Sequence, residues 1–215
     1  MSNSPMKQSS HLLFFELCLS YCLILFATQL FLVNDDLYFN SLSDKLSYER
    51  ILEILTERQK WSWLNYVIVP VFFFLKLFLI SICFTVGAFV VNLKLSFKVF
   101  FRVAIIAEFV FVAPPLIKLF WFVLFRTNYG FEDLQYFSPL SIISLIGAKE
   151  VESWLVYPLQ LLNIFELLYW FALAHQLKIV IGRGMSGSLV FVAGTYGAGL
   201  LIWVVVVMFL LISIT

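Results

Sequence analysis

Five long apolar runs constrain this chain more than any other feature of its sequence. Each run is continuous rather than alternating, and a helix needs about 20 mostly apolar residues to cross the hydrocarbon of a bilayer. We predict membrane-spanning helices at residues 12–33, 63–92, 97–125, 154–177 and 188–214. Only helices and closed barrels satisfy their backbone in hydrocarbon, and continuous runs exclude a barrel. The predicted fold is an all-α, polytopic transmembrane helical bundle with five spans.

The composition agrees with lipid as the solvent. The 215 residues are 62% hydrophobic and 13% charged, whereas soluble domains average roughly 45–50% apolar and about 25% charged residues. The net charge is +1, and no Lys/Arg cluster offers a nucleic-acid face. We predict a single transmembrane domain over residues 1–215. The run at 12–33 lacks a cleavage site and is too long for a signal peptide, so we expect a retained helix.

Two polar segments, at residues 34–60 and 126–153, separate the spans. In the first, apolar residues recur at helical spacing over 44–58, which predicts an amphipathic helix lying on the membrane surface. In the second, the apolar piece at 139–146 is too short to cross, so it is interfacial or re-entrant.

The short loops predict the orientation in the membrane. The N-terminus and the loops at 93–98 and 178–183 carry cations and no acids. These cations are Lys7, Lys94, Lys98, Lys178 and Arg183, with Arg102 just inside its span. The long polar segments carry as many Lys and Arg together with many acids, so the acid-free loops decide the orientation. We expect a cytoplasmic N-terminus and an outside C-terminus. Abundant Phe, Ile, Leu and Lys with little Ala suits an AT-rich bacterial genome, and hence a bacterial inner membrane.

Ionisable residues inside the spans are the candidate functional residues. Lys76, Glu108 and Glu166 fall near mid-membrane on three different helices, and Glu16 and Arg102 could form a second pair nearer one end. A charge at the bilayer centre costs about 2.5–3.5 kcal/mol, so such groups usually face the bundle and pair. They could line a substrate or proton path. The favoured interpretation is a buried network that fixes helix register or contacts another subunit.

Backbone features mark two further helices. Pro114 and Pro115 remove two backbone donors in the third span and predict a kink. In the fifth span, small residues recur four apart as Ala193/Gly197 and Gly194/Ala198. Such pairs predict a face that packs closely against another helix, in this chain or in a partner.

No arrangement of residues indicates catalysis, a cofactor or a metal. Cys18, Cys22 and Cys83 lie inside apolar runs and are expected to pack as small hydrophobic residues. His175 ends the fourth span, where a cap or interface role fits better than chemistry. We therefore predict a protein that is not an enzyme, with no catalytic, cofactor-binding or metal-ligating residues.

The C-terminal part of the chain resembles a known membrane family. The segments LLNIFELLYWFALAHQLK and IVIGRGMSGSLVFVAGTYGAGLL, within residues 154–215, resemble the end of the Yip1-type family. The resemblance implies five spans, a cytosolic N-terminus and a non-cytosolic C-terminus. Eukaryotic members are linked to vesicle trafficking and Rab proteins, but this chain lacks their long cytosolic N-terminal region, so Rab binding does not carry over.

Two functional hypotheses follow from these features. The first is a membrane scaffold or accessory subunit that binds other integral membrane proteins or itself. The second is a small transporter or channel using Lys76, Glu108 and Glu166, and an intramembrane enzyme remains only as a residual possibility. A shared water-accessible cavity at the three charges would favour transport, whereas dry burial would favour the scaffold.

Overall fold

The computed structural model describes residues 9–126, 129–147 and 150–214. It is 84% helical, and its described residues form no β-strand. Five helical stretches are long and apolar enough to cross a membrane: Ser10–Phe31, Tyr48–Val90, Phe97–Leu124, Ile164–Ile181 and Met185–Ser213. The all-α class and the five spans are confirmed, and these helices are those of an integral membrane protein. Lys7, which entered the orientation argument, lies outside the described residues.

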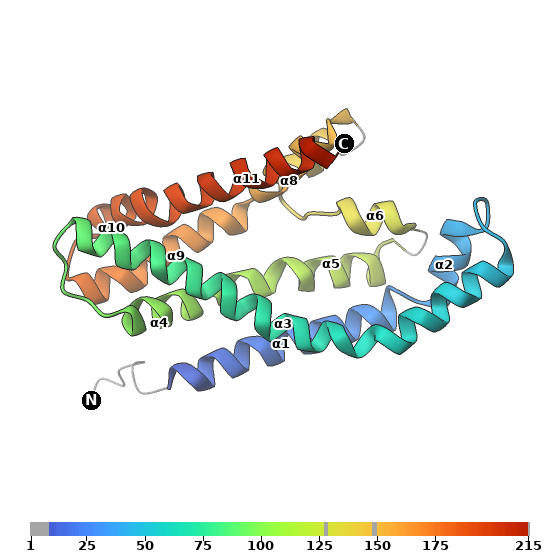
Figure 1. The fold of residues 1–215 in the computed structure, drawn as a ribbon, viewed down its shortest axis with the longest axis horizontal. Helices are drawn as coiled ribbons and strands as arrows, with labels where there is room; N and C mark the ends of the chain where they lie inside the picture. The colour runs from blue at the N-terminus through green and yellow to red at the C-terminus, as the bar shows by residue number, and fades with distance from the viewer. Residues whose placement is uncertain (1–8, 127–128, 148–149, 215) are drawn as a thin grey trace.

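The five long helical stretches run roughly along one common axis (Figure 1). In chain order the helical elements are α1 (Ser10–Phe31), α2 (Asp35–Leu42), α3 (Tyr48–Val90), α4 (Phe97–Glu108), the 3-10 turn η2 (Phe109–Val112), α5 (Ala113–Leu124), α6 (Phe131–Tyr136), α7 (Ile142–Ile146), α8 (Ser153–Leu161), α9 (Ile164–Ile181), α10 (Met185–Val192), the π-helical turn η4 (Ala193–Gly197) and α11 (Ala198–Ile214). Figure 1 shows the start of α1 and the α3–α4 and α9–α10 turns at one end, and α2, α6 and α8 at the other. The start of α1 and the end of α11 lie at opposite ends, as an odd number of spans requires.

The amphipathic segment predicted at 44–58 is helical from Tyr48, but it forms the start of a longer helix instead of a surface helix apart from the second span. Helix α3 runs without a break from Tyr48 to Val90 and includes the second span. No Gly or Pro occurs between Tyr48 and Pro70, so nothing in the sequence ends the helix before it enters the membrane. At 1.5 Å per residue its 43 residues extend about 65 Å. That length exceeds the roughly 30 Å hydrocarbon core, so the first turns of α3 project out of the membrane.

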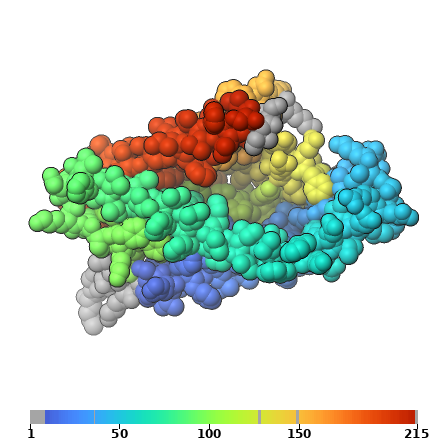
Figure 2. Space-filling model, in the orientation of Figure 1, coloured from blue at the N-terminus to red at the C-terminus, as the bar shows by residue number. Residues whose placement is uncertain are grey.

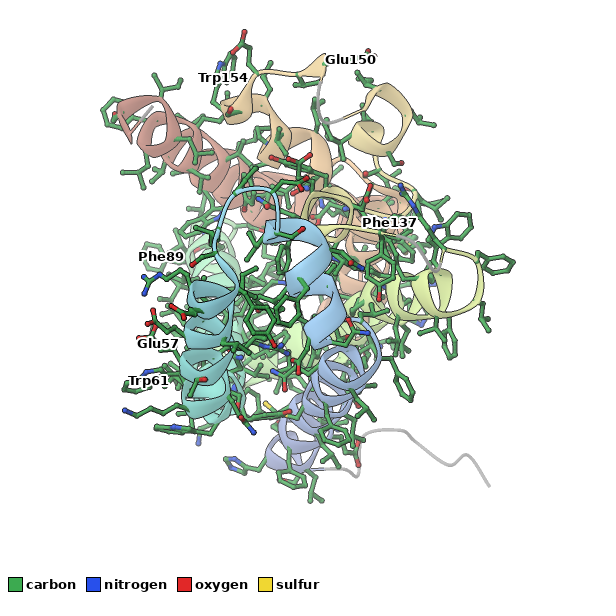
Figure 3. The ribbon with its side chains drawn as sticks, turned by 90° about the vertical axis from the view of Figure 1, so that its right-hand side faces the viewer. Glu57, Trp61, Phe89, Phe137, Glu150 and Trp154 are labelled. Carbon is green, nitrogen blue, oxygen red and sulfur yellow. The ribbon has the colours of Figure 1, made fainter. Side chains whose placement is uncertain are left out.

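The projecting part of α3 packs against α2 and the end of α1. Arg58 donates a 2.7 Å hydrogen bond from Nη2 to the backbone carbonyl of Val33 and lies 5.1 Å from the ring centroid of Tyr38. Figure 3 looks along the bundle from this end, with α2 beside α3 and the side chains of Glu57 and Trp61 on the side of α3 away from α2. The amphipathic pattern of this segment thus reflects docking onto α2 and α1.

The third span is divided just before its two prolines. Predicted as one kinked helix at 97–125, it consists of α4, the 3-10 turn η2 and α5, with Pro114 and Pro115 in the first turn of α5. Neither proline has an N–H for the carbonyls of Val110 and Phe111 one turn earlier. The helix tightens to 3-10 geometry over those residues, so the change in helix form precedes the prolines.

The fourth span begins later than predicted. The segment expected at 154–177 is divided into α8 and α9, and the spanning helix is Ile164–Ile181. Asn163 causes the division because its side-chain oxygen accepts the backbone N–H of Glu166 at 2.8 Å and caps α9. The short segment before α7 is hydrogen-bonded to the start of α9, since Ile164 donates its backbone N–H to the carbonyl of Leu140 at 3.2 Å.

The buried core lies at one half of the bundle. Its main cluster joins α3, α4, α9, α10 and η4, with Leu17 from α1. Alanines on α3, α4 and α9 (Ala88, Ala104, Ala107 and Ala174) are at most 2% exposed, so these helices approach closely. A smaller cluster near the other end joins α1, α2, α5 and α6. The main cluster surrounds the intramembrane charges.

Candidate functional site: a buried polar cluster

Lys76 and Glu108 form an ion pair inside the bundle. Lys76 lies near the middle of the membrane part of α3, and Glu108 is the last residue of α4. The Nζ atom of Lys76 donates to Oε1 of Glu108 at 2.5 Å. The Glu108 side chain is 0% exposed and the Lys76 side chain is 30% exposed. Such an arrangement meets the requirement that a buried charge have a charged, hydrogen-bonded partner.

Aromatic rings complete the surroundings of the Lys76 ammonium group. Its Nζ lies 4.3 Å from the ring centroid of Phe111 and 5.8 Å from that of Tyr169. Ring faces attract a cation by their negative quadrupole, most strongly where water is excluded. The 3-10 turn η2 contributes Phe111, so the interruption of the third span has a direct structural role at the ion pair.

Glu166 occupies a second, separate hydrogen-bonding arrangement. Its Oε1 accepts from Nε1 of Trp170 at 2.9 Å and from the hydroxyl of Tyr196 at 2.7 Å, and the residue is 8% exposed. Glu166 lies in the first turn of α9, where the helix dipole favours a carboxylate. The position is created by Asn163, whose side chain caps the start of α9.

Tyr169 connects the two arrangements. It is 0% exposed, and its ring lies 4.8 Å from the ring of Phe111 and 5.3 Å from that of Tyr196. Its hydroxyl is close enough to Glu108 to interact electrostatically, yet neither that hydroxyl nor Oε2 of Glu108 has a hydrogen bond of good geometry. We call Lys76, Glu108, Glu166, Tyr169 and Tyr196 the polar cluster.

The structure therefore brings together the three charges that the sequence singled out, but only two of them as an ion pair. Glu166 lies in the first turn of its spanning helix and not, as predicted, at the middle of the span. Lys76 binds Glu108, whereas Glu166 is held by neutral donors. Sequence reasoning missed Tyr169, Tyr196 and Trp170. The i, i+4 spacing of Glu166 and Trp170 on one helix could have indicated their hydrogen bond. No local signal points to Tyr196, which comes from a distant turn of the chain.

The other predicted charges lie outside the polar cluster. Nη2 of Arg102 is buried without a hydrogen-bond partner among the described residues, so this nitrogen does not bind Glu16. The backbone carbonyl of Glu16 accepts the Ser20 hydroxyl at 2.8 Å, and the pairing of Glu16 with Arg102 stays a prediction. A further intramembrane cation, Lys118, donates from Nζ to the backbone carbonyl of Leu134.

The small-residue face of the fifth span is divided between two surroundings. A Cβ atom added to Gly197 would lie 2.7 Å from the ring of Trp170, so this glycine permits close packing of η4 on α9. Ala193, Gly194 and Ala198 are exposed instead, and a Cβ atom on Gly194 would meet nothing within 4 Å. Of the four residues predicted to form one packing face, Gly197 is thus internal and the other three are external.

Gly194 and Ala198 border a groove between α3 and the α10–α11 stretch. We call it the glycine groove; its small residues are Gly87, Gly187, Gly194, Ala198 and Gly199, and its volume is about 470 Å³. Helices α3 and α10–α11 lie side by side on the face that Figure 2 displays. Gly87 allows α3 and η4 to approach this closely, because a Cβ atom at this position would lie 2.0 Å from Cγ2 of Thr195.

Comparisons with protein-family models, with curated proteins and with solved structures found no significant match to this chain. The resemblance of residues 154–215 to the Yip1-type family stays a prediction from sequence. Among the described residues, no group of three His, Cys, Asp or Glu side chains is placed to hold a metal ion. What the site offers is a paired charge and a hydrogen-bonded carboxylate, both fixed by aromatic side chains.

Proposed function

We propose that this protein is a non-enzymatic scaffold or accessory subunit that binds a transmembrane helix of another membrane protein, or of a second copy, in the glycine groove. The observation that carries this proposal is the exposed set of small residues on η4 and α11. At Gly194 and Ala198 no bulky side chain covers the backbone on the outer face. In lipid the hydrophobic effect does not drive helices together, so their association depends on close packing, which small residues permit.

The polar cluster supports a structural rather than a conducting role. Glu108 and Glu166 are at most 8% exposed, and none of Lys76, Glu108 and Glu166 lines the glycine groove or the groove beside α1 described below. An ion pair that links α3 to α4, and a carboxylate that links α9 to η4, fix the mutual register of four segments. A fixed register keeps both walls of the glycine groove in place.

The membrane and orientation belong to the same proposal. We place the protein in a bacterial inner membrane with its N-terminus in the cytoplasm, because the end of the bundle holding the 93–98 and 178–183 loops carries cations without acids. The Yip1-type resemblance supports the same orientation. It also supports a role exercised through other membrane proteins.

The experiment compares two tryptophan substitutions in full-length protein purified from native membranes in mild detergent. Ala198→Trp fills the glycine groove, whereas Val71→Trp places the same side chain at a 63% exposed position of α3 outside both grooves. We expect a co-purifying membrane protein, or the dimer mass, with wild type and Val71→Trp and its loss with Ala198→Trp. A monomer without partner for wild type, or equal recovery with both variants, contradicts the proposal.

A transporter or channel is the second candidate, and one observation favours it. Oε2 of Glu108 and the Tyr169 hydroxyl are buried without hydrogen-bond partners among the described residues, beside a lysine that is 30% exposed. Unsatisfied buried groups of this kind mark functional sites in some proteins. Proton or ion flux into reconstituted vesicles that Glu108→Gln abolishes, with unchanged thermal unfolding, would favour this candidate. Absence of flux in wild type would exclude it.

A further inference from the structure

A second and larger groove runs along the outer side of the bundle between α1, α3 and α4. Its volume is about 870 Å³, which lies within the range of about 300–1,000 Å³ that small-molecule sites occupy. In Figure 2, α1 lies along the lower edge of the molecule, next to α3 and α4. We call it the phenylalanine groove, and it is distinct from the polar cluster and from the glycine groove.

The walls of this groove are aromatic. Five phenylalanines line it: Phe14, Phe15, Phe74, Phe97 and Phe101. Phe101 fixes the α3–α4 wall, since its ring centroid lies 6.1 Å from that of Phe74 and 6.0 Å from that of Phe97. Pro70 lies at the deep end, where a proline inside α3 loosens the helix. Such a surface suits an acyl chain.

The depth of the groove matches one leaflet of a bilayer. Along α1 its lining extends from Ser10 to Cys22, which at 1.5 Å per residue is about 18 Å. The hydrocarbon core is roughly 30 Å thick, so the groove reaches from the membrane surface to about the bilayer centre. An occupant of this length has its polar end at the start of α1 and its apolar end between the helices.

The open end of the groove is cationic. Lys98 in the first turn of α4, His11 in the first turn of α1, and the hydroxyl groups of Ser9 and Ser10 line it, and no Asp or Glu is among the described lining residues. The positive end of the α4 dipole also points there. Glu16, the only acid in α1, does not line the groove.

One turn deeper on α4 lies a further cation. Arg102 follows Lys98 by four residues and so shares its face of the helix. Its Nη2 is buried without a hydrogen-bond partner among the described residues. The combination of cations, hydroxyl donors and an apolar channel one leaflet deep is complementary to a phosphate attached to an acyl chain.

We propose that the phenylalanine groove binds one anionic phospholipid of the adjacent leaflet, with its phosphate between Lys98 and His11 and one acyl chain along the phenylalanine wall. The lipid would tie α1 to the α3–α4 pair at the end of the bundle where α1 begins. This site is independent of the proposed partner helix, which would occupy the glycine groove on the other side of α3.

The test is native mass spectrometry of delipidated, full-length protein titrated with dioleoylphosphatidylglycerol or dioleoylphosphatidylcholine. We expect the first phosphatidylglycerol to bind more tightly than phosphatidylcholine. Lys98→Ala should weaken that first binding step about fivefold, the effect of one basic residue at an anionic lipid surface. Lys94→Ala is the matched control, because it removes the same charge four residues earlier, in the loop before α4, and Lys94 does not line the groove. It should leave the affinity unchanged.

A second variant tests the apolar part of the site. Leu19→Trp fills the groove from α1 at a residue that is 47% exposed, so folding should survive while the tight phosphatidylglycerol step is lost. Equal affinity for the two lipids overturns the proposal. So does an equal effect of Lys98→Ala and Lys94→Ala, or an unchanged first step in Leu19→Trp.

Discussion

The α3–α4–α9 core and the last helix present two different solutions to folding in lipid. In the most apolar 18-residue segment of each span, 33% of the residues are buried inside the protein in the third and fourth spans, but only 11% in the fifth. The core uses this burial to hold an ion pair and a hydrogen-bonded carboxylate. The last helix has no acid or base between Ser186 and Thr215 and presents small and apolar residues outward. Charged side chains must be shielded from lipid by the protein, whereas small residues can contact another helix only where they stay exposed to lipid.

The difference also separates two kinds of close packing. Gly87, Gly197 and Gly199 lie where an added Cβ atom would collide with Thr195, Trp170 and Cys83. Gly194, from the same sequence stretch, faces open space. The internal glycines are needed for the fold of this chain. An added Cβ atom at Gly194 would meet no neighbour within 4 Å, and its place in the glycine groove suits an intermolecular contact.

The strongest test of the core removes the cation alone. Lys76→Met should cost about 3–5 kcal/mol in the free energy of unfolding, because Glu108 would be left buried without a partner. Unfolding in mild detergent by stepwise addition of a denaturing detergent measures this cost. Lys60→Met, at an exposed lysine of the same helix, serves as the control and should change little.

The double variant Lys76→Met with Glu108→Leu sharpens that result. Replacing both members of a buried ion pair by apolar side chains is often neutral or stabilising. We therefore expect most of the lost stability to return. A double variant as unstable as Lys76→Met would mean that Glu108 contributes through contacts other than Lys76.

A glycine pair compares the internal and external packing surfaces directly. Gly87→Ala should destabilise the protein by about 1–3 kcal/mol, as overpacking does, because its Cβ atom would lie 2.0 Å from Thr195. Gly194→Ala should be neutral or slightly stabilising, since a helical glycine costs about 0.5–1 kcal/mol relative to alanine. Equal melting temperatures for the two variants would contradict the assignment of the two surfaces.

Glu166 tests how much the neutral hydrogen bonds contribute. Glu166→Leu leaves Nε1 of Trp170 and the Tyr196 hydroxyl without their acceptor, which should cost about 1–3 kcal/mol. Glu166→Gln keeps a side-chain oxygen at the same place and should cost less. The two variants are compared by thermal unfolding, with tryptophan fluorescence reporting on Trp170. A larger loss for Gln than for Leu would show that this carboxylate is not held as described.

The smallest effect is expected at the cap of α9. Asn163→Ala removes the side-chain acceptor for the Glu166 backbone N–H and should cost about 1 kcal/mol. Asn163→Asp keeps an acceptor oxygen and should recover most of that loss. If Asn163→Ala and wild type unfold alike, the division between α8 and α9 has another cause.

Sequence patterns located the spans but not their interruptions. Residues 12–33 and 97–125 agree closely with the helical stretches Ser10–Phe31 and Phe97–Leu124, because hydrophobic length is a local property. The fourth span was placed ten residues too early, since the apolar run across residues 154–163 looks like helix while the cap at Asn163 divides it. Likewise, the amphipathic pattern of 44–58 correctly indicated a helix. The pattern alone did not show that this helix continues into the second span, which it does because no Gly or Pro interrupts it before Pro70.

For the polar cluster, the sequence identified Lys76, Glu108 and Glu166 as residues that must be satisfied inside the protein, because a lone charge in hydrocarbon is too costly. The sequence also determined the all-α class, because in hydrocarbon only helices and closed barrels satisfy every backbone hydrogen bond, and continuous apolar runs exclude a barrel. Only the packing of α3, α4, α9 and η4 decided that Lys76 pairs with Glu108 and that Tyr196 meets Glu166. Partner choice depends on helix rotation and crossing, which arise from contacts between segments far apart in the chain.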